Sequence, residues 1–332
     1  MTRLALADAE ALARRVLVAS RTSETAAASV AAALVAAEAD GLASHGLSRL
    51  PAYADQAKSG KVQGMAEPAL TRTARASLRV DARDGFAYPA IALGLDAMAK
   101  LASDTGVAAL AVANSHHFGV AGHHVEKLAA RGLVGLGFGN SPGAIAAWGG
   151  AKPIFGTNPI AFASPREGKA PLVIDLSLSK VARGKIMVAA QKGEAIPEGW
   201  ALDASGKPTT DSKAALGGTM LPMGDARGQQ LVLMVELLTA ALTGSQFGYE
   251  ASSFFTADGP PPRVGQFFLA FDPKAFSGPT NFAARAEALF AEILSVPGAR
   301  LPGDRRLKLR TKAEKDGVEI PDALHQEILR RG

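Results

Sequence analysis

The chain has 332 residues, 48% hydrophobic and 20% charged, with a formal net charge of +5, and a chain of this length normally forms about two or three domains. It contains no cysteine, which excludes disulfides, a thiolate nucleophile and cysteine-ligated zinc or iron–sulfur centres. Basic residues gather between positions 305 and 315 without interleaved aromatic residues, so we expect no nucleic-acid partner.

The N-terminal part of the chain predicts helices. Residues Ala5 to Val18 are charged every few positions and rich in alanine, leucine and arginine, which favours a helix over a signal or transit peptide. Thr22 or Ser23 is a suitable cap for a second helix that runs to Asp40 and stops at Gly41. No apolar stretch reaches the length of about 18 residues that a membrane span needs. We therefore expect a cytoplasmic protein with no membrane partner.

The middle of the chain mixes helical and strand-like patterns. Helices are expected at 87–105, 122–131 and 231–242, and strands at the short apolar runs 108–112, 134–138, 172–174 and 267–271. From Phe282 onward the pattern is helical again, interrupted by Pro297, Pro302 and Pro321. We predict a mixed α and β core, with the two helical ends of the chain packed together.

A first polar segment, Asp40 to Arg49, leaves the predicted helix at Gly41. It holds Ser44, His45 and Arg49, and Tyr53 follows shortly after. An arginine binds a carboxylate through two parallel hydrogen bonds, and a neighbouring histidine is a donor for an adjacent oxygen. The alternative is a capped helix end with a surface histidine.

A second segment, 114–124, contains His116, His117, His123 and His124 directly after a predicted strand. Imidazoles at close spacing bind zinc or nickel, so a metal-dependent lyase or hydrolase is one hypothesis. No carboxylate pattern completes such a site, and the side chains of adjacent residues on a strand or loop point in different directions. We therefore predict no metal. A histidine in a glycine-flanked loop at a strand end is also suited to proton transfer. The structural alternative is a single packed histidine.

Three further segments are rich in glycine or end in polar residues. The run 139–159 places glycine and proline among small polar residues, which suits close approach of the backbone to a ligand, although no G-x-G-x-x-G fingerprint occurs. Asp175 ends a predicted strand and is either a ribose acceptor or a helix cap. The loop 221–228 carries Arg227 into a helix, as an anion site or with Asp225 as an ordinary cap.

Together these segments resemble the type-2 malate/L-lactate dehydrogenase family, which includes sulfolactate, ureidoglycolate and diketogulonate enzymes and pyrroline/piperideine-2-carboxylate reductases. The resemblance rests on ASHGLSR, SHHFGVAG, GGAKPIFGTNPIAFASP, PEGWALDASGKPTTD and LPMGDARG, in that order. It extends from about residue 4 to the C-terminal helices. Many members have a lysine in a G-x-K-G-Y-G segment, where this chain has Arg227 in GDARGQQ.

The resemblance implies an α/β (α+β type) fold that binds NAD or NADP without a Rossmann domain, around a mixed, largely antiparallel sheet. It implies a helical domain formed by residues 1–75 and 283–332, and a NAD(P)-binding and catalytic domain at 76–282. It also implies a homodimer with the active site near the subunit interface.

The resemblance further implies an NAD(P)-dependent dehydrogenase or reductase of a small carboxylate substrate. His117 matches the acid/base histidine, and His45 and Arg49 match the substrate side. The positions implied for the cofactor are Ser141, Thr157, Asn158, Asp175, Leu176, Ser177, Arg227 and Gly303. The expected substrate is a 2-hydroxy or 2-oxo acid such as malate, lactate or sulfolactate, and the alternative is a cyclic imine such as pyrroline-2-carboxylate. A binding protein without catalysis is disfavoured by the intact histidines.

Overall fold

The computed structural model describes residues 1–278 and 280–332, and its centre is a seven-stranded mixed sheet. Only β3 and β4 pair in parallel within it, and the other neighbours are antiparallel. The mixed α/β prediction is confirmed. In spatial order the strands are β2 (Ala69–Ala74), β3 (Ser77–Asp81), β4 (Val107–Ser115), β13 (Val264–Phe271), β5 (Val134–Gly139), β8 (Ile160–Ser164) and β9 (Leu172–Leu176).

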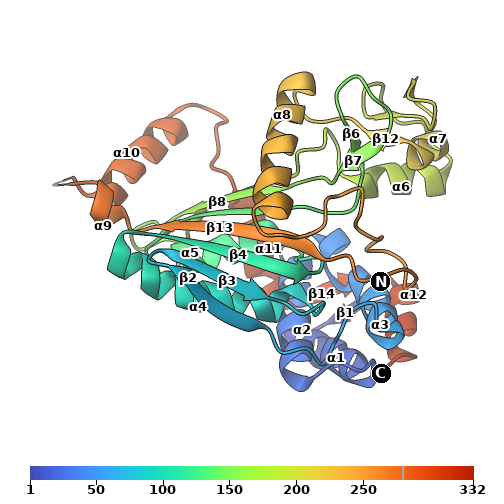
Figure 1. Cartoon of the computed structure of the whole chain (residues 1–332), viewed down its shortest axis with the longest axis horizontal. Coiled ribbons are helices and arrows are strands. Elements are labelled where there is room, and N and C mark those ends of the chain that lie inside the picture. The colour runs from blue at the N-terminus through green and yellow to red at the C-terminus, as the bar shows by residue number, and fades with distance from the viewer. Residues whose placement is uncertain (279) are drawn as a thin grey trace.

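Both faces of this sheet are covered, which is why its central strands read as continuous apolar runs. Helices α4 (Ala87–Thr105) and α5 (Ala121–Ala129) lie along one face, and α8 (Asp225–Glu236) lies on the other (Figure 1). Gly94 lets α4 approach β4 closely, because a Cβ there would come within 2.6 Å of Leu110. The core on this face includes Ile91, Leu95, Met98, Leu110, Val125 and Phe268.

A smaller sheet of five short strands stands beside the main one. It packs with α6 (Arg183–Lys192) and α7 (Ser212–Gly217) into a second apolar core that continues onto the far face of the central sheet. Its strands, in spatial order, are β11 (Pro208–Thr209), β10 (Ala201–Leu202), β12 (Thr219–Met220), β6 (Ile145–Ala146) and β7 (Pro153–Phe155).

The two ends of the chain lie side by side (Figure 1). Strand β1 (Thr2–Leu4) pairs antiparallel with β14 (Val318–Ile320). One apolar cluster joins residues of both ends, including Leu17, Leu34, Ala313 and Ile328. The helices around this cluster are α1 (Leu6–Ala19), α2 (Glu24–Ala39), α3 (Leu50–Ser59), α11 (Asp304–Asp316) and α12 (Asp322–Leu329).

Helix α10 (Phe282–Ser295) follows the short α9 (Pro273–Phe276) and projects away from this cluster (Figure 1). Its buried Phe290 packs instead with Leu172 and Leu301 beside β9.

Most predicted elements form with small shifts in their ends. Ser23 caps α2, since its side chain accepts from the Ala26 amide, and α4 has the predicted bounds. The predicted helix 231–242 begins earlier, at Asp225, and its last turn is the π-helix η3 (Leu237–Ala241). Gly224, rather than Asp225, occupies the N-cap position of α8. Among the described residues, no helix is both long and apolar enough to cross a membrane.

Candidate active site

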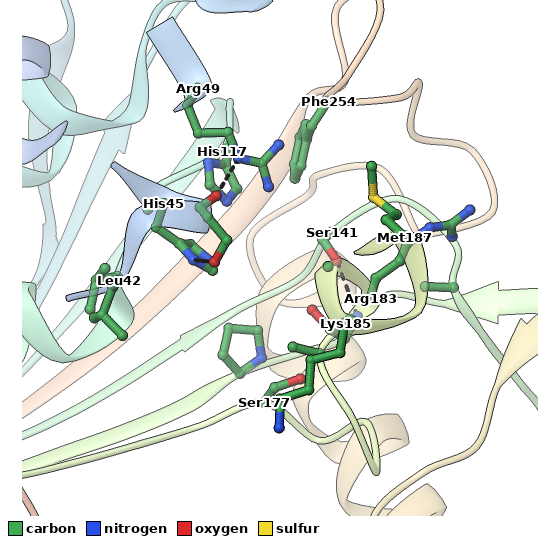
Figure 2. A pocket seen from close by; sticks show the side chains of 18 of the residues that line it. Leu42, His45, Arg49, His117, Ser141, Ser177, Arg183, Lys185, Met187 and Phe254 are labelled. Carbon is green, nitrogen blue, oxygen red and sulfur yellow. Dashed lines mark hydrogen bonds between the residues drawn. The ribbon is translucent and has the colours of Figure 1, made fainter. Parts of the chain in front are cut away.

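A cleft of about 1770 Å³ opens between the terminal helices, the central sheet and α6. Figure 2 shows His45, Arg49 and His117 on one side of it, and Ser177, Arg183, Lys185 and Met187 on the other. The structure therefore brings together residues that are far apart in the sequence. Of the predicted positions, those that line this cleft are His45, Arg49, His117, Ser141, Thr157, Asp175, Leu176, Ser177 and Gly303.

Arg49 ends a pair of 3-10 turns, η1 (Ala43–His45) and η2 (Leu47–Arg49). Its Nε donates to the Ser44 carbonyl at 2.8 Å, and its guanidinium lies 4.4 Å from the centre of the Phe255 ring. One terminal nitrogen, Nη1, is buried and has no hydrogen-bond partner. A guanidinium held this way, with a free donor beside a cleft, is suited to an anionic ligand.

His45 lies beside Arg49 on the same turns. Its Nδ1 is 3.0 Å from the Ser44 hydroxyl, and its ring stacks on that of His117 with centroids 5.5 Å apart. Burial first, and then the positive charges of Arg49 and His123, together lower the pKa of His45 to about 4. This imidazole is therefore neutral at ordinary pH.

His117 is buried at the inner end of the cleft. Its Nδ1 lies 2.5 Å from the Tyr53 hydroxyl, which is itself 3.2 Å from the Tyr88 hydroxyl. The ring also packs on Phe254, with centroids 5.1 Å apart. Burial and then the charge of Arg49 hold the pKa of His117 well below its ordinary value. Because Nδ1 is engaged by Tyr53, Nε2 remains for a ligand.

The other histidines of this segment have separate surroundings. The ring nitrogens of His116 are both buried without a partner, and burial lowers its pKa to about 3. His124 donates from Nε2 to the Phe118 carbonyl at 2.8 Å, and His123 lies 2.7 Å from Asp40. Within residues 1–278 and 280–332, no three histidine, aspartate or glutamate side chains gather as metal ligands.

Asp175, on β9, caps a helix and is exposed to the cleft. Its Oδ2 accepts from the Gly122 amide at 2.7 Å, so it caps the start of α5 rather than the helix that follows it. Desolvation by the surrounding wall of the cleft raises the pKa of Asp175, and the hydrogen bond from the Gly122 amide acts in the opposite direction. Leu176 and Ser177 continue along the same wall, exposed to the cleft.

Asn158 and Arg227 do not line the cleft. Asn158 is fully buried, and its Nδ2 donates to Glu236 at 2.7 Å and to the Val232 carbonyl at 3.0 Å. It therefore fixes the loop that carries Thr157, whose amide donates to the Ser141 hydroxyl at 3.1 Å. Arg227 is exposed in the first turn of α8.

The sequence reasoning missed two cations at the start of α6. Arg183 and Lys185 line the cleft opposite Arg49 (Figure 2). Burial lowers the pKa of Arg183, whose Nη2 donates to the Leu216 carbonyl at 3.3 Å. No carboxylate of the described residues forms an ion pair with either. The sequence pattern that could have indicated an anion-binding site here is the Arg-Gly-Lys run at a helix start shortly after Ser177.

It also missed the role of the basic C-terminal run. Arg306 lines the cleft and donates to Glu126 at 2.8 Å and to Asp40 at 3.1 Å. Arg310 donates to both oxygens of the same Asp40, each at 2.8 Å. These cations are thus used inside the molecule, where they join α2, α5 and α11.

Comparisons with known proteins identify the family of this chain. The family model for malate/L-lactate dehydrogenase matches residues 4–329. The (2R)-3-sulfolactate dehydrogenase (NADP(+)) of Chromohalobacter salexigens is 54% identical over 325 residues, 98% of this chain and 96% of that protein. The Delta(1)-pyrroline-2-carboxylate/Delta(1)-piperideine-2-carboxylate reductase of Pseudomonas aeruginosa is 43% identical, covering 99% of each chain.

A solved structure gives the same result for the fold. The crystal structure of the delta1-piperideine-2-carboxylate reductase of Pseudomonas syringae pvar. tomato superposes with a TM-score of 0.94 at 37% identity, covering 100% of both chains. Fold and site together define an NAD(P)-dependent dehydrogenase or reductase. The chain belongs to the malate/L-lactate dehydrogenase family, as its sequence motifs predict. The comparisons give no support to a lyase.

Proposed function

We propose that this chain is an NADP-dependent oxidoreductase that interconverts a 2-oxo acid and a 2-hydroxy acid bearing a second anionic group, with (2R)-3-sulfolactate as the leading substrate. One observation carries the proposal. Arg49 has a free buried donor on one wall, while Arg183 and Lys185 face it without an ion-pair partner among the described residues. Cations on opposite walls suit a substrate with an acid group at each end.

The cleft fits a nicotinamide dinucleotide by volume and by the chemistry of its donors. It measures about 1770 Å³, more than a small acid needs. Ser141, Thr157, Asp175, Leu176, Ser177 and Gly303 are the lining residues that we assign to the cofactor. The first amides of α6 supply positive charge for phosphate groups. When bound, the reduced cofactor supplies the hydride that is added to C2 of the substrate.

The proposed roles of the protein residues follow from their contacts. Arg49 binds the carboxylate, since its Nη1 is the free donor of this wall. His117 exchanges the proton at the C2 oxygen through Nε2. His45, stacked on His117, donates to a neighbouring substrate oxygen. We assign no ligand contact to Asn158 or Arg227, which lie outside the lining.

Tyr53 suits this proton exchange, because a hydroxyl both donates and accepts hydrogen bonds. Burial raises the pKa of Tyr53, so the phenol keeps its proton. In the oxidation direction, neutral His117 donates from Nδ1 to Tyr53 and accepts the substrate proton at Nε2. In the reduction direction, the protonated ring releases the same proton to the C2 oxygen.

A cyclic-imine reductase is the second candidate. Its support is the close superposition with the reductase of Pseudomonas syringae and the 43% identity with that of Pseudomonas aeruginosa. A pyrroline-2-carboxylate presents a planar C2 beside a carboxylate, so Arg49 and His117 have the same roles. Only the second anionic group is missing, which leaves Arg183 without a ligand in this candidate.

The experiment is a turnover assay with NADPH and NADH, followed by the absorbance of the reduced cofactor. The substrates are 3-sulfopyruvate, oxaloacetate, pyruvate, pyrroline-2-carboxylate and piperideine-2-carboxylate. We expect the highest kcat/KM with NADPH and sulfopyruvate. A higher kcat/KM for an imine selects the second candidate, and no turnover with any of them contradicts both.

We also propose that residues 1–75 and 283–332 form a helical domain and that residues 76–282 form a non-Rossmann, NAD(P)-binding and catalytic domain. The first part is supported by the apolar cluster that joins both chain ends, although α10 packs beside β9. The second is supported by the mostly antiparallel sheet and the absence of a G-x-G-x-x-G segment. We also propose a cytoplasmic location, on the basis of the family to which the chain belongs.

We propose a homodimer as the assembled form. It is supported by apolar side chains on the outer surface of α8 and η3, where Leu233, Leu237 and Leu242 are 42%, 53% and 61% exposed. Single exposed apolar residues are ordinary, but a contiguous group marks an interface. Light scattering after gel filtration measures the mass, and a monomer at micromolar concentration contradicts the proposal.

A further inference from the structure

The loop 253–258 lies between η3 and β13 in the chain, and it covers the inner side of the cleft. It places Phe254 on His117, with ring centroids 5.1 Å apart, and Phe255 over the Arg49 guanidinium at 4.4 Å. Figure 2 shows Phe254 reaching toward these side chains from a loop outside the central sheet. The position of this loop therefore determines the apolar boundary around the substrate carboxylate.

A single buried cation holds the loop. Lys61 is only 3% exposed, and its Nζ donates to the carbonyls of Ser253 at 2.7 Å, Thr256 at 3.0 Å and Asp258 at 2.8 Å. An ammonium has three protons, so these carbonyls satisfy it completely. No carboxylate of the described residues forms an ion pair with it. A buried charge is costly unless hydrogen-bonded, so the loop must keep this shape around Lys61.

The tether and the carboxylate-binding arginine belong to one segment. Helix α3 begins directly after Arg49 and ends two residues before Lys61. Two polar side chains of this helix strengthen the attachment. Gln56 donates to the Thr256 carbonyl at 3.1 Å, and Ser59 donates to the Ala257 carbonyl at 3.0 Å. The loop is thus fixed to the helix that positions Arg49.

We propose that Lys61 is a positioning residue that holds the loop 253–258 closed over the substrate site. It keeps Phe255 on Arg49 and Phe254 on His117, and so sets the affinity for the substrate carboxylate. That the bound group is a substrate carboxylate rests on the proposed function. That Lys61 holds the loop 253–258 in place does not. Lys61 touches no reacting atom, so its removal raises KM and leaves kcat nearly unchanged.

The test replaces Lys61 with methionine, which keeps the length of the side chain and removes the donors. The matched control is Lys58→Met, since Lys58 is an exposed lysine in the last turn of the same helix. Hydrogen–deuterium exchange of the amides 253–258 is measured without ligand, and KM and kcat are measured with sulfopyruvate and NADPH. For Lys61→Met we expect exchange and KM each to rise about tenfold or more. Lys58→Met should resemble the unaltered protein.

Unchanged exchange at 253–258 in Lys61→Met overturns the tether, whatever the substrate is. Faster exchange with an unchanged KM overturns the link to substrate binding. If the methionine variant does not fold, Lys61→Gln keeps two of the donor protons and should give a smaller rise in both quantities. If the unaltered protein does not turn over sulfopyruvate, the proposed function fails while the exchange result still decides the tether.

Discussion

The proton exchange that we propose at His117 depends on side chains that are distant in the sequence. Tyr53 engages Nδ1 at 2.5 Å, and Phe254 and His45 pack against the ring. The sequence indicated His117 and its neighbours by their position after a strand. It did not indicate Tyr53 as the partner, because helix α3 meets that strand end only in the folded chain.

Replacing His117 with alanine should lower kcat by about 10²–10⁴-fold, the usual contribution of a general acid or base. Steady-state turnover with the best substrate measures this. His325→Ala, in α12, is the matched control and should leave kcat unchanged. Near-normal turnover of the His117 variant would transfer the role to His45 or His116.

The charge of Arg49 should control the pH dependence of oxidation. Oxidation needs a neutral His117, and burial together with Arg49 keeps its pKa well below the ordinary 6.5. The value of kcat/KM should therefore stay level from pH 8 down through pH 6.5, with its acid limb below the ordinary pKa of a histidine. Arg49→Gln removes a nearby positive charge, so the pKa of His117 rises and the acid limb moves to higher pH.

The same variant should raise KM about tenfold or more, since a charged hydrogen bond to the carboxylate is lost. A pH profile of kcat/KM for both proteins measures the two effects. An acid limb near pH 6.5 in the unaltered protein, unmoved by Arg49→Gln, would contradict this assignment. Lys61 was not predicted, because an isolated basic residue gives no pattern in a sequence, whereas Arg183 and Lys185 were missed although they form an Arg-Gly-Lys run at a helix start.

Helix ends were the most predictable elements. Thr22 and Ser23 were the two candidate caps of α2, and the structure selects Ser23, whose hydroxyl accepts from the Ala26 amide at 3.3 Å. Ser23→Ala should lower the free energy of unfolding by about 1 kcal/mol, measured by urea denaturation. Ser295→Ala, at the exposed end of α10, is the control and should change it by less than about 0.5 kcal/mol. An equal loss of unfolding free energy in the two variants would show that the Ser23 cap does not stabilise α2.

The start and end of α8 were not predictable in the same way. Gly224 has a φ of +66°, which allows a left-handed turn to begin the helix before the apolar run. The run then ends in the π-helix η3, where Thr239 donates to the Val235 carbonyl at 2.7 Å. Apolar periodicity carries no signal for such a turn, because the stretch is apolar on most sides.

On the scale of the whole molecule, a buried network of charged side chains holds the chain ends against the central sheet. Asp40 is fully buried and accepts from Arg306 and Arg310, which also donate to Glu126 on α5. Burial alone would raise the pKa of Asp40, but hydrogen bonds from Arg310 and His123 hold it far below its usual range. Loss of this carboxylate leaves Arg306 and Arg310 to share Glu126, among the described carboxylates, and removes the partner of His123.

Asp40→Ala should therefore lower the free energy of unfolding by about 3–5 kcal/mol, measured by denaturant titration. The control is Asp96→Ala, which removes an exposed pair with Arg131 and should cost less than about 1 kcal/mol. A similar loss of unfolding free energy in both variants would show that the buried network stabilises the fold no more than an exposed ion pair does. The contact between the chain ends was expected from their helical composition, whereas this network required the folded chain.

The cleft itself was only partly predictable. The sequence indicated its wall residues through the family motifs, from Arg49 to Gly303. It gave no signal for the small second sheet, because several of its strands are only two residues long and are formed by tertiary packing. Helix α10 was expected from Phe282 onward, but its packing beside β9, through its buried Phe290, was not.

The most direct test of the proposed function follows the hydrogen that reaches C2. The protein is incubated with 3-sulfopyruvate and NADPH deuterated at C4 of the nicotinamide, and the product is analysed by mass spectrometry. We predict sulfolactate with one deuterium at C2, from one of the two C4 positions only. Product without deuterium at C2, or no product while pyrroline-2-carboxylate is labelled, would contradict the proposal.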